Sequence, residues 1–174
     1  LNKNKKKIKK QMIKLHSTII PDCVWIEPSK FEDKRGVFSE TFKSWFLPHF
    51  KPVQTNYSFS KKGVLRGVHR TPYAKLVTCV KGNVYDVCVD LRPDSPTYKN
   101  YFGVILHETV LNSLYIPPYC GHAFIAMTDS ILVYQQDHEY DKALDEAFCY
   151  SDYDINWPIP PTIVSDKDQN CCDR

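Results

Sequence analysis

Residues 56–98 read NYSFSKKGVLRGVHRTPYAKLVTCVKGNVYDVCVDLRPDSPTY and alternate strongly between apolar and polar side chains. In the later run, Val84, Asp86 and Cys88 share one parity, and a period of two places side chains on alternate faces of a β-sheet. Gly82-Asn83 precedes this run and supplies the positive φ that a tight hairpin requires. The stretch therefore predicts consecutive β-strands joined by short turns.

The rest of the chain continues this pattern of short runs, punctuated by Pro, Gly, Asn and Asp, with twelve prolines in 174 residues. Such spacing favours an all-β sandwich or barrel, and the length suits one domain with a sizeable core. We expect an irregular or helical turn at 44–50, and a domain at 12–164 followed by a polar tail at 165–174. The predicted strands are 17–27, a strand entered after Gly36, 53–60, 63–69, 75–81, 83–91, 98–106, 111–116 and 131–136.

The formal net charge of +3 hides an uneven distribution of charge. Seven of the 23 lysines and arginines lie in residues 1–15, which contain no acid, so the other 16 face 20 acidic residues. We expect residues 1–11 to be a disordered, solvated extension, with binding to nucleic acid or to an anionic surface as the alternative. No apolar stretch approaches the roughly 20 residues that span a bilayer, so we expect no membrane partner.

The seven cysteines show no paired spacing. No CxxC pair or zinc-type pattern exists, and Cys79 and Cys88 fall within strand-like runs as small hydrophobic residues. We find no secretory signal, because the lysine-rich start is not followed by an apolar segment. These features favour a reducing compartment, and we expect a cytoplasmic protein.

His69 is the first candidate for chemistry, because it lies between two strand-like runs with Arg66, Arg70 and Lys75 close by in the sequence. A histidine acts as a general base when a carboxylate orients its imidazole, and the cations suit a substrate with negative charge. The alternative is a structural histidine, hydrogen-bonded in a turn.

Further candidates lie in other strands. His122, in PPYCGHAF, could join His69 at a metal, but the H-x-H unit of metal-binding cupins is missing. Tyr134 is either a core aromatic or an acid that faces a cavity. Asp86 and Asp90 share one face of a strand, where they form either a buried charge network or a solubilising surface.

Six ordered motifs, which span about residues 20–158, resemble the RmlC family, the dTDP-4-dehydrorhamnose 3,5-epimerases. They are DKRGVFSETF (33–42), VQTNYSFSKKGVLRGVH (53–69), AKLVTCVKGNVYDVCVDLRPDSPTY (74–98), IPPYCGHAF (116–124), VYQQDHEY (133–140) and INWP (155–158). The resemblance implies a double-stranded β-helix, the cupin-like jelly roll, which is usually a homodimer and needs no cofactor or metal. It also implies a nucleoside-diphosphate 4-keto-6-deoxy sugar as substrate, foremost dTDP-4-dehydro-6-deoxyglucose, epimerised at C3, C5 or both to give dTDP-4-dehydrorhamnose.

The resemblance also assigns roles by position. His69 would be the base, Tyr134 the acid on the opposite face of the sugar, and Lys75 the group that stabilises the enolate oxygen. The resemblance further implies that the following residues contact the substrate: Arg35, Phe38, Glu40, Gln54, Asn56, Arg66 and His122. The first three lie on a strand that could reach across a dimer.

Two departures from the family pattern affect the site. Relatives orient the base with an aspartate that precedes an Ile-x-Trp unit. In the corresponding segment FCYSDYDINWP we assign that role to Asp152, an assignment that requires a two-residue deletion, rather than to Asp154. Arg70 replaces the usual aromatic and could reach a phosphate or signal a different sugar. The open alternatives are a single-centre epimerase or isomerase on another nucleotide keto sugar, and a non-catalytic cupin that binds a sugar nucleotide.

Overall fold

The computed structural model describes residues 13–169 and is built almost entirely from β-strands, as predicted. Helical structure is confined to the short segments η1 (Lys142–Leu144), η2 (Tyr150–Asp152) and α1 (Asp166–Gln169) within this range. The predicted extension 1–11 lies outside the described residues. The strands are β1 (Lys14–Ser17), β2 (Val24–Glu27), β3 (Lys30–Asp33), β4 (Gly36–Ser39), β5 (Gln54–Ser60), β6 (Val64–Arg70), β7 (Lys75–Lys81), β8 (Asn83–Val89), β9 (Tyr101–His107), β10 (Ser113–Ile116), β11 (Gly121–Ala126), β12 (Ser130–Gln136), β13 (Glu146–Ala147) and β14 (Ile163–Val164).

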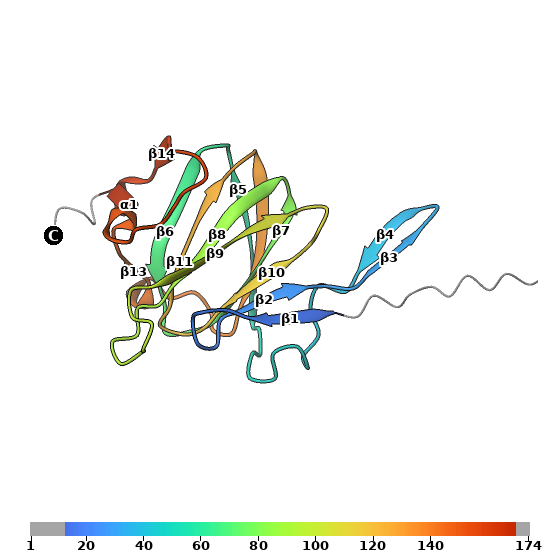
Figure 1. The fold of residues 1–174 in the computed structure, drawn as a ribbon, viewed down its shortest axis with the longest axis horizontal. Helices are drawn as coiled ribbons and strands as arrows, with labels where there is room; N and C mark the ends of the chain where they lie inside the picture. The colour runs from blue at the N-terminus through green and yellow to red at the C-terminus, as the bar shows by residue number, and fades with distance from the viewer. Residues whose placement is uncertain (1–12, 170–174) are drawn as a thin grey trace, which may run out of the picture.

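Two sheets face each other and form the jelly-roll barrel that the sequence predicted (Figure 1). The first sheet has the order β1-β2-β10-β7-β12-β5, and the second has the order β13-β6-β11-β8-β9 with β14 added beside β6. The main core lies between them and combines Val77 and Leu132 of the first sheet with Val84 and Phe124 of the second. Burial of these apolar faces, at about 25 cal/mol per Å² removed from water, is the main force that holds the sheets together.

The alternation in the sequence determines which side chains enter the barrel. In β8, Val84 and Cys88 belong to the core between the sheets, whereas Val87 and Val89 belong to a second cluster on the outer face. Asp86 has the parity of the inward residues and is completely buried. The inward face of β8 therefore combines two core residues with one buried carboxylate.

Three sequence predictions about local structure can be compared with the backbone. The range 17–27, predicted as one strand, instead contains the last residue of β1, a turn at Pro21-Asp22 in which Asp22 has a φ of 67°, and β2, which pairs antiparallel with β1. The segment 44–50 is an irregular turn that packs Phe46 and Phe50 against the outer face of the first sheet. Gly82 has a φ of 72° and joins β7 to β8, as predicted.

The β3–β4 hairpin stands apart from the barrel (Figure 1). Its two strands pair with each other as a separate two-stranded sheet, and the Lys30 ammonium donates to the Thr109 carbonyl. Phe38 on this hairpin is 65% exposed. Two-stranded hairpins are marginal by themselves, so this one gains from any surface that covers it.

Residues 163–169 return to the barrel. The short β14 pairs in parallel with the beginning of β6, and α1 follows directly. Part of the segment assigned to a polar tail is thus helix α1, whose Asp168 is only 2% exposed. Within residues 13–169 no helix is long and apolar enough to cross a membrane, and the cytoplasmic location stays a prediction.

Candidate active site

The candidate catalytic residues converge from the two sheets at one end of the barrel. On the second sheet, β6 and β11 pair in a register that sets His69 opposite His122 and Arg66 opposite Phe124. On the first sheet, β12 sets Tyr134 opposite Asn56 of β5. These positions were predicted separately from motifs far apart in the sequence, and the barrel brings them together because all of them face inward.

His69 is hydrogen-bonded to Asp168. Its Nε2 atom lies 2.6 Å from Oδ1 of Asp168, while Oδ2 accepts the backbone N–H of Gly67 at 3.2 Å. Burial would raise the pKa of Asp168, but the hydrogen bonds and the charge of His69 hold that pKa below its ordinary value. A carboxylate only accepts, so Nε2 carries the hydrogen and Nδ1 of the neutral ring keeps its lone pair for a substrate proton.

Asp152, the predicted partner of His69, is not the residue that pairs with it. Asp152 lies in η2 and lines a surface pocket of about 220 Å³ beside Arg70 and Phe148. The assignment failed because it counted back from Ile155 and Trp157, whereas the pairing carboxylate comes later in the chain. One local signal was present, since Ser165-x-x-Asp168 is the spacing of a helix N-terminal cap, and Ser165 does accept the Asp168 N–H.

Gly67 allows β6 and β11 to approach closely beside His69. Its φ is +111°, and a Cβ built on it would lie 2.4 Å from the His122 carbonyl oxygen and 2.8 Å from Cα of Ala123. Both contacts are with backbone, which cannot move aside as a flexible side chain can. Glycine at this position therefore sets the local geometry of the base.

His122 has its own buried partner. Its Nε2 lies 2.8 Å from Oδ1 of Asp86, and burial raises the pKa of Asp86 while the charge of His122 opposes that rise. The second oxygen of Asp86, Oδ2, has no hydrogen-bond partner in the described part of the chain. Of the two alternatives for Asp86, the structure selects the buried charge network. Asp90 instead ends its strand and binds Arg92, Ser95 and Thr97 in a turn.

Lys75 begins β7 and sits at the same end of the barrel. Its Nζ lies 5.8 Å from the centroid of the Tyr73 ring, and burial lowers the pKa of Lys75 from 10.5 to about 8. The nearby Asp145 carboxylate opposes this fall in the pKa. A partly buried ammonium of this kind is suited to bind a developing negative charge, because water competes less with it than at an open surface.

Tyr134 faces the same space from β12. Burial raises the pKa of its phenol, and the positive charge of Arg66 opposes this rise, which places the two side chains within each other's field. Its hydroxyl makes no hydrogen bond with the described residues, so its proton is available to a bound molecule. The Arg66 guanidinium itself donates to Ser60 Oγ and to the Phe59 carbonyl at the rim.

A chain of amides completes the wall beside Tyr134. Gln54 donates to Asn56 at 2.6 Å, and Asn56 donates to the buried Gln136 at 3.2 Å. The side-chain oxygen Oε1 of Gln54 also accepts a hydrogen bond from the backbone N–H of Tyr140. This network fixes the amide groups of Gln54, Asn56 and Gln136 relative to one another.

Four predicted residues lie elsewhere. Arg70 turns to the outside, where it pairs with Glu146 and lies over the Phe148 ring, so its charge is directed away from His69. Arg35 pairs with Asp33 at the tip of the β3–β4 hairpin. Phe38 of the same hairpin and Glu40, which follows it and pairs with Lys43, are likewise not brought to the site within this chain.

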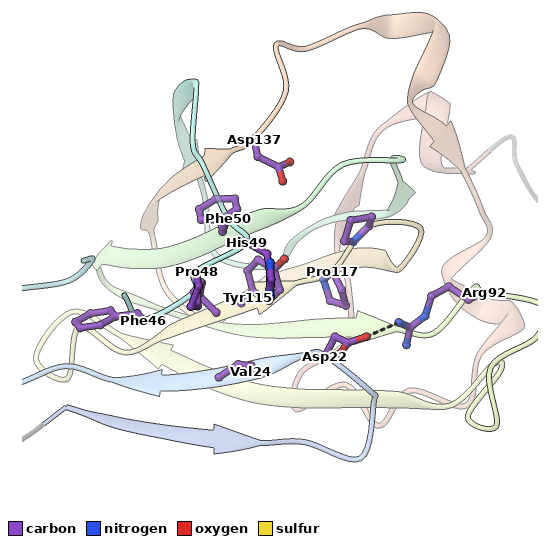
Figure 2. A pocket seen from close by; sticks show the side chains of 12 residues that line it. Asp22, Val24, Phe46, Pro48, His49, Phe50, Arg92, Tyr115, Pro117 and Asp137 are labelled. Atoms are coloured by element: carbon purple, nitrogen blue, oxygen red, sulfur yellow. Dashed lines mark hydrogen bonds and ion pairs between the residues drawn. The ribbon is translucent and has the colours of Figure 1, made fainter. Parts of the chain in front are cut away.

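A separate pocket of about 530 Å³ lies on the outer face of the first sheet (Figure 2). Phe50, Tyr115 and Pro117 point into it, and the Asp22–Arg92 ion pair closes one end. Its lining shares no residue with the His69 set. Among the described residues, no three His, Cys, Asp or Glu side chains converge as metal ligands would.

The arrangement at the end of the barrel can move protons at a carbon centre. A carboxylate-bonded imidazole on one sheet has the chemistry of a base, and the facing sheet carries a phenol with the chemistry of an acid and an ammonium that could stabilise negative charge. These are the parts needed to form and reprotonate an enolate.

Comparison with known proteins yields the same assignment. The dTDP-4-dehydrorhamnose 3,5-epimerase family profile matches residues 17–173. A Shigella flexneri protein of that name is 41% identical over 165 residues, covering 88% of this chain and 91% of the relative. A Streptomyces niveus dTDP-4-dehydrorhamnose 3-epimerase is 36% identical, covering 84% and 77%. The structure of a Legionella pneumophila 3,5-epimerase in complex with dTDP-4-keto-L-rhamnose has a TM-score of 0.85 at 32% identity, with 90% of each chain covered. The chain therefore belongs to the dTDP-4-dehydrorhamnose 3,5-epimerase family.

Proposed function

We propose that this protein epimerises a nucleoside-diphosphate 4-keto-6-deoxy sugar, converting dTDP-4-dehydro-6-deoxyglucose to dTDP-4-dehydrorhamnose. One observation carries the proposal: a chain of this family holds a His69–Asp168 pair across the barrel from Tyr134 and Lys75. Because the 4-ketone acidifies the hydrogens on C3 and C5, the reaction needs only a base, an acid and stabilisation of the enolate.

In this proposal His69 removes a proton from C3 or C5 through Nδ1. The electron pair of the broken C–H bond moves to the ketone oxygen, and the Lys75 ammonium stabilises the resulting enolate. Tyr134 then donates its proton to the opposite face of the same carbon, which inverts the centre. Solvent returns a proton to the tyrosinate and takes the one held by His69, so the enzyme regains its starting state.

The binding residues follow from their positions. Gln54 and Asn56 present amides toward the sugar, His122 with Asp86 lies beside His69, and Arg66 at the rim contacts the diphosphate. The narrower alternative, inversion of C3 alone, is favoured by one observation, since a 36% identical relative is named a 3-epimerase.

We propose a homodimer in which the β3–β4 hairpin of one protomer contacts the nucleotide in its partner. The exposed Phe38 and the Arg35 guanidinium lie on a hairpin that leaves its own barrel, which supports this arrangement (Figure 1). Sedimentation equilibrium tests it, and a monomer at micromolar concentration would contradict it.

The function is tested by proton NMR of dTDP-4-keto-6-deoxyglucose incubated with the protein in D2O. Loss of both the C3 and C5 proton signals supports the 3,5-epimerase, and loss of the C3 signal alone supports the single-centre enzyme. A coupled 4-ketoreductase then reports the configuration of the product. No exchange with a folded protein would contradict the proposal and direct attention to a non-catalytic cupin that binds the nucleotide sugar.

The pH dependence of kcat/KM is expected to show an alkaline limb near pH 8. The pKa of Lys75 is lowered to about 8, so the amine is charged below that pH and neutral above it, where it stabilises an enolate poorly. The profile of kcat/KM reports ionisations of the free enzyme. In Lys75→Arg the cation no longer titrates in this range, so this limb should vanish even though the rate falls. An unchanged limb in that variant would exclude Lys75 as its source.

A further inference from the structure

The carboxylate that orients His69 sits on a segment with little structure of its own. Helix α1 has four residues, and β14 before it pairs only two residues with β6. A single helical turn is unstable in isolation, because nucleation of a helix costs more than one hydrogen bond returns. The position of Asp168 must therefore be held by tertiary contacts of this segment.

One such contact is made by the residue next to Asp168. The Lys167 ammonium lies 2.7 Å from Oδ2 of Asp145, the residue that ends η1. The Lys167 side chain is 48% exposed, whereas that of Asp145 is only 10% exposed. The Tyr140 hydroxyl donates to the same Asp145 oxygen at 3.3 Å. The Asp145 carboxylate is thus held by Tyr140 of its own segment, and Lys167 bonds to it from α1.

The two contacts of α1 address different parts of the site. Asp168 binds His69 and the Gly67 N–H on β6, while Lys167 binds Asp145 in the segment 140–145. The same segment contains Tyr140, whose backbone N–H donates a hydrogen bond to Gln54. Loss of the Lys167 contact would leave a nearly buried Asp145 carboxylate without its closest cation, which is unfavourable. Loss of this contact would also remove the hydrogen bond that holds α1 in place at the residue next to Asp168.

We propose that the Asp145–Lys167 ion pair keeps Asp168 hydrogen-bonded to His69, which makes Asp145 and Lys167 positioning residues for proton abstraction. The expected change in kcat rests on the proposed function, whereas the expected weakening of the His69–Asp168 hydrogen bond does not. Neither side chain touches the reacting atoms in this scheme, and each acts on the base through Asp168. Because Asp145 also raises the pKa of Lys75 and Lys167 lowers it, kcat is compared on the acid side of the Lys75 limb, where Lys75 is charged.

The test is a double-mutant cycle with Lys167→Gln and Asp145→Asn, read out by kinetics and by NMR. Each single variant is expected to lower kcat about tenfold with KM changed less than twofold, and the double variant to be no worse, because one interaction is lost in all three. Lys167→Arg, which keeps the charge, should retain wild-type kcat. Lys14→Gln, which breaks an exposed ion pair with Glu27 on β1 and β2, serves as the matched control.

The NMR measurement uses the free protein and no substrate. The imidazole N–H held by Asp168 should give a low-field proton signal in the wild type, which Asp168→Asn identifies by its loss. This signal should weaken in Lys167→Gln and Asp145→Asn but persist in Lys14→Gln. A signal and a kcat unchanged in Lys167→Gln would overturn the inference, as would additive losses in the double variant. If the wild type did not turn over, the proposed function would fail while the NMR signal still decided the inference.

Discussion

Replacing His69 with Asn is expected to abolish turnover, with kcat reduced by about 10²–10⁴-fold, the range usually lost with a general base. The Asn amide is shorter than the imidazole and does not reach the Nε2 position that lies 2.6 Å from Asp168, but Asp168 keeps its hydrogen bond from the Gly67 N–H, so the fold should be retained. The amide cannot accept a proton from carbon at neutral pH. Because one base is proposed to serve both centres, exchange with D2O should cease at C3 and C5 together.

The matched variant is Tyr134→Phe, which removes the acid and leaves the base. It should reduce turnover while some solvent exchange persists, because the enolate still forms and can return its proton to His69. Thermal unfolding of both variants, compared with wild type, separates chemistry from folding. Full exchange in His69→Asn would contradict the mechanism, and equal loss of exchange in both variants would contradict the division of roles between the two faces.

The strands were predictable because their signal is local. Alternation of period two is imposed by the two faces of a sheet, so β5 to β8 lie almost where the sequence placed them. Lys75, Tyr134 and His69 were assigned to the site through the family resemblance instead, and in the structure Lys75 and Tyr134 share the parity of the core residues of their strands. The single strand predicted at 17–27 was wrong, because the turn at Pro21-Asp22 lies inside that run and separates β1 from β2.

The partner of the base was not predictable by the same argument. The contact between His69 and Asp168 spans 99 positions, and α1 carries no apolar periodicity that would mark it as part of the domain. Asp152 was chosen because it lies close in sequence to Ile155 and Trp157, but closeness in sequence does not determine which carboxylate reaches His69 in the folded chain. The N-terminal cap spacing at Ser165 indicated a helix turn but not the barrel residue it would reach.

The pairing can be tested directly by comparing Asp168→Asn with Asp152→Asn. In Asp168→Asn the amide oxygen can still accept the Gly67 N–H, but its NH2 group then faces Nε2 of His69. Nε2 must accept that hydrogen bond, so the ring hydrogen moves to Nδ1, which becomes a donor and no longer a base. We expect kcat to fall about 10²-fold or more, as when the carboxylate of a catalytic triad is made neutral.

Asp152→Asn changes the same functional group on η2, beside the outward-facing Arg70, and should leave kcat within about twofold of wild type, as most surface substitutions do. Exchange at C3 and C5 in D2O measures both variants in one assay. A large loss in Asp152→Asn with a small one in Asp168→Asn would return the base-orienting role to the residue first chosen from the sequence. The expected result instead places the orienting carboxylate on the last described turn of the chain, so that residues beyond the barrel strands complete its catalytic base.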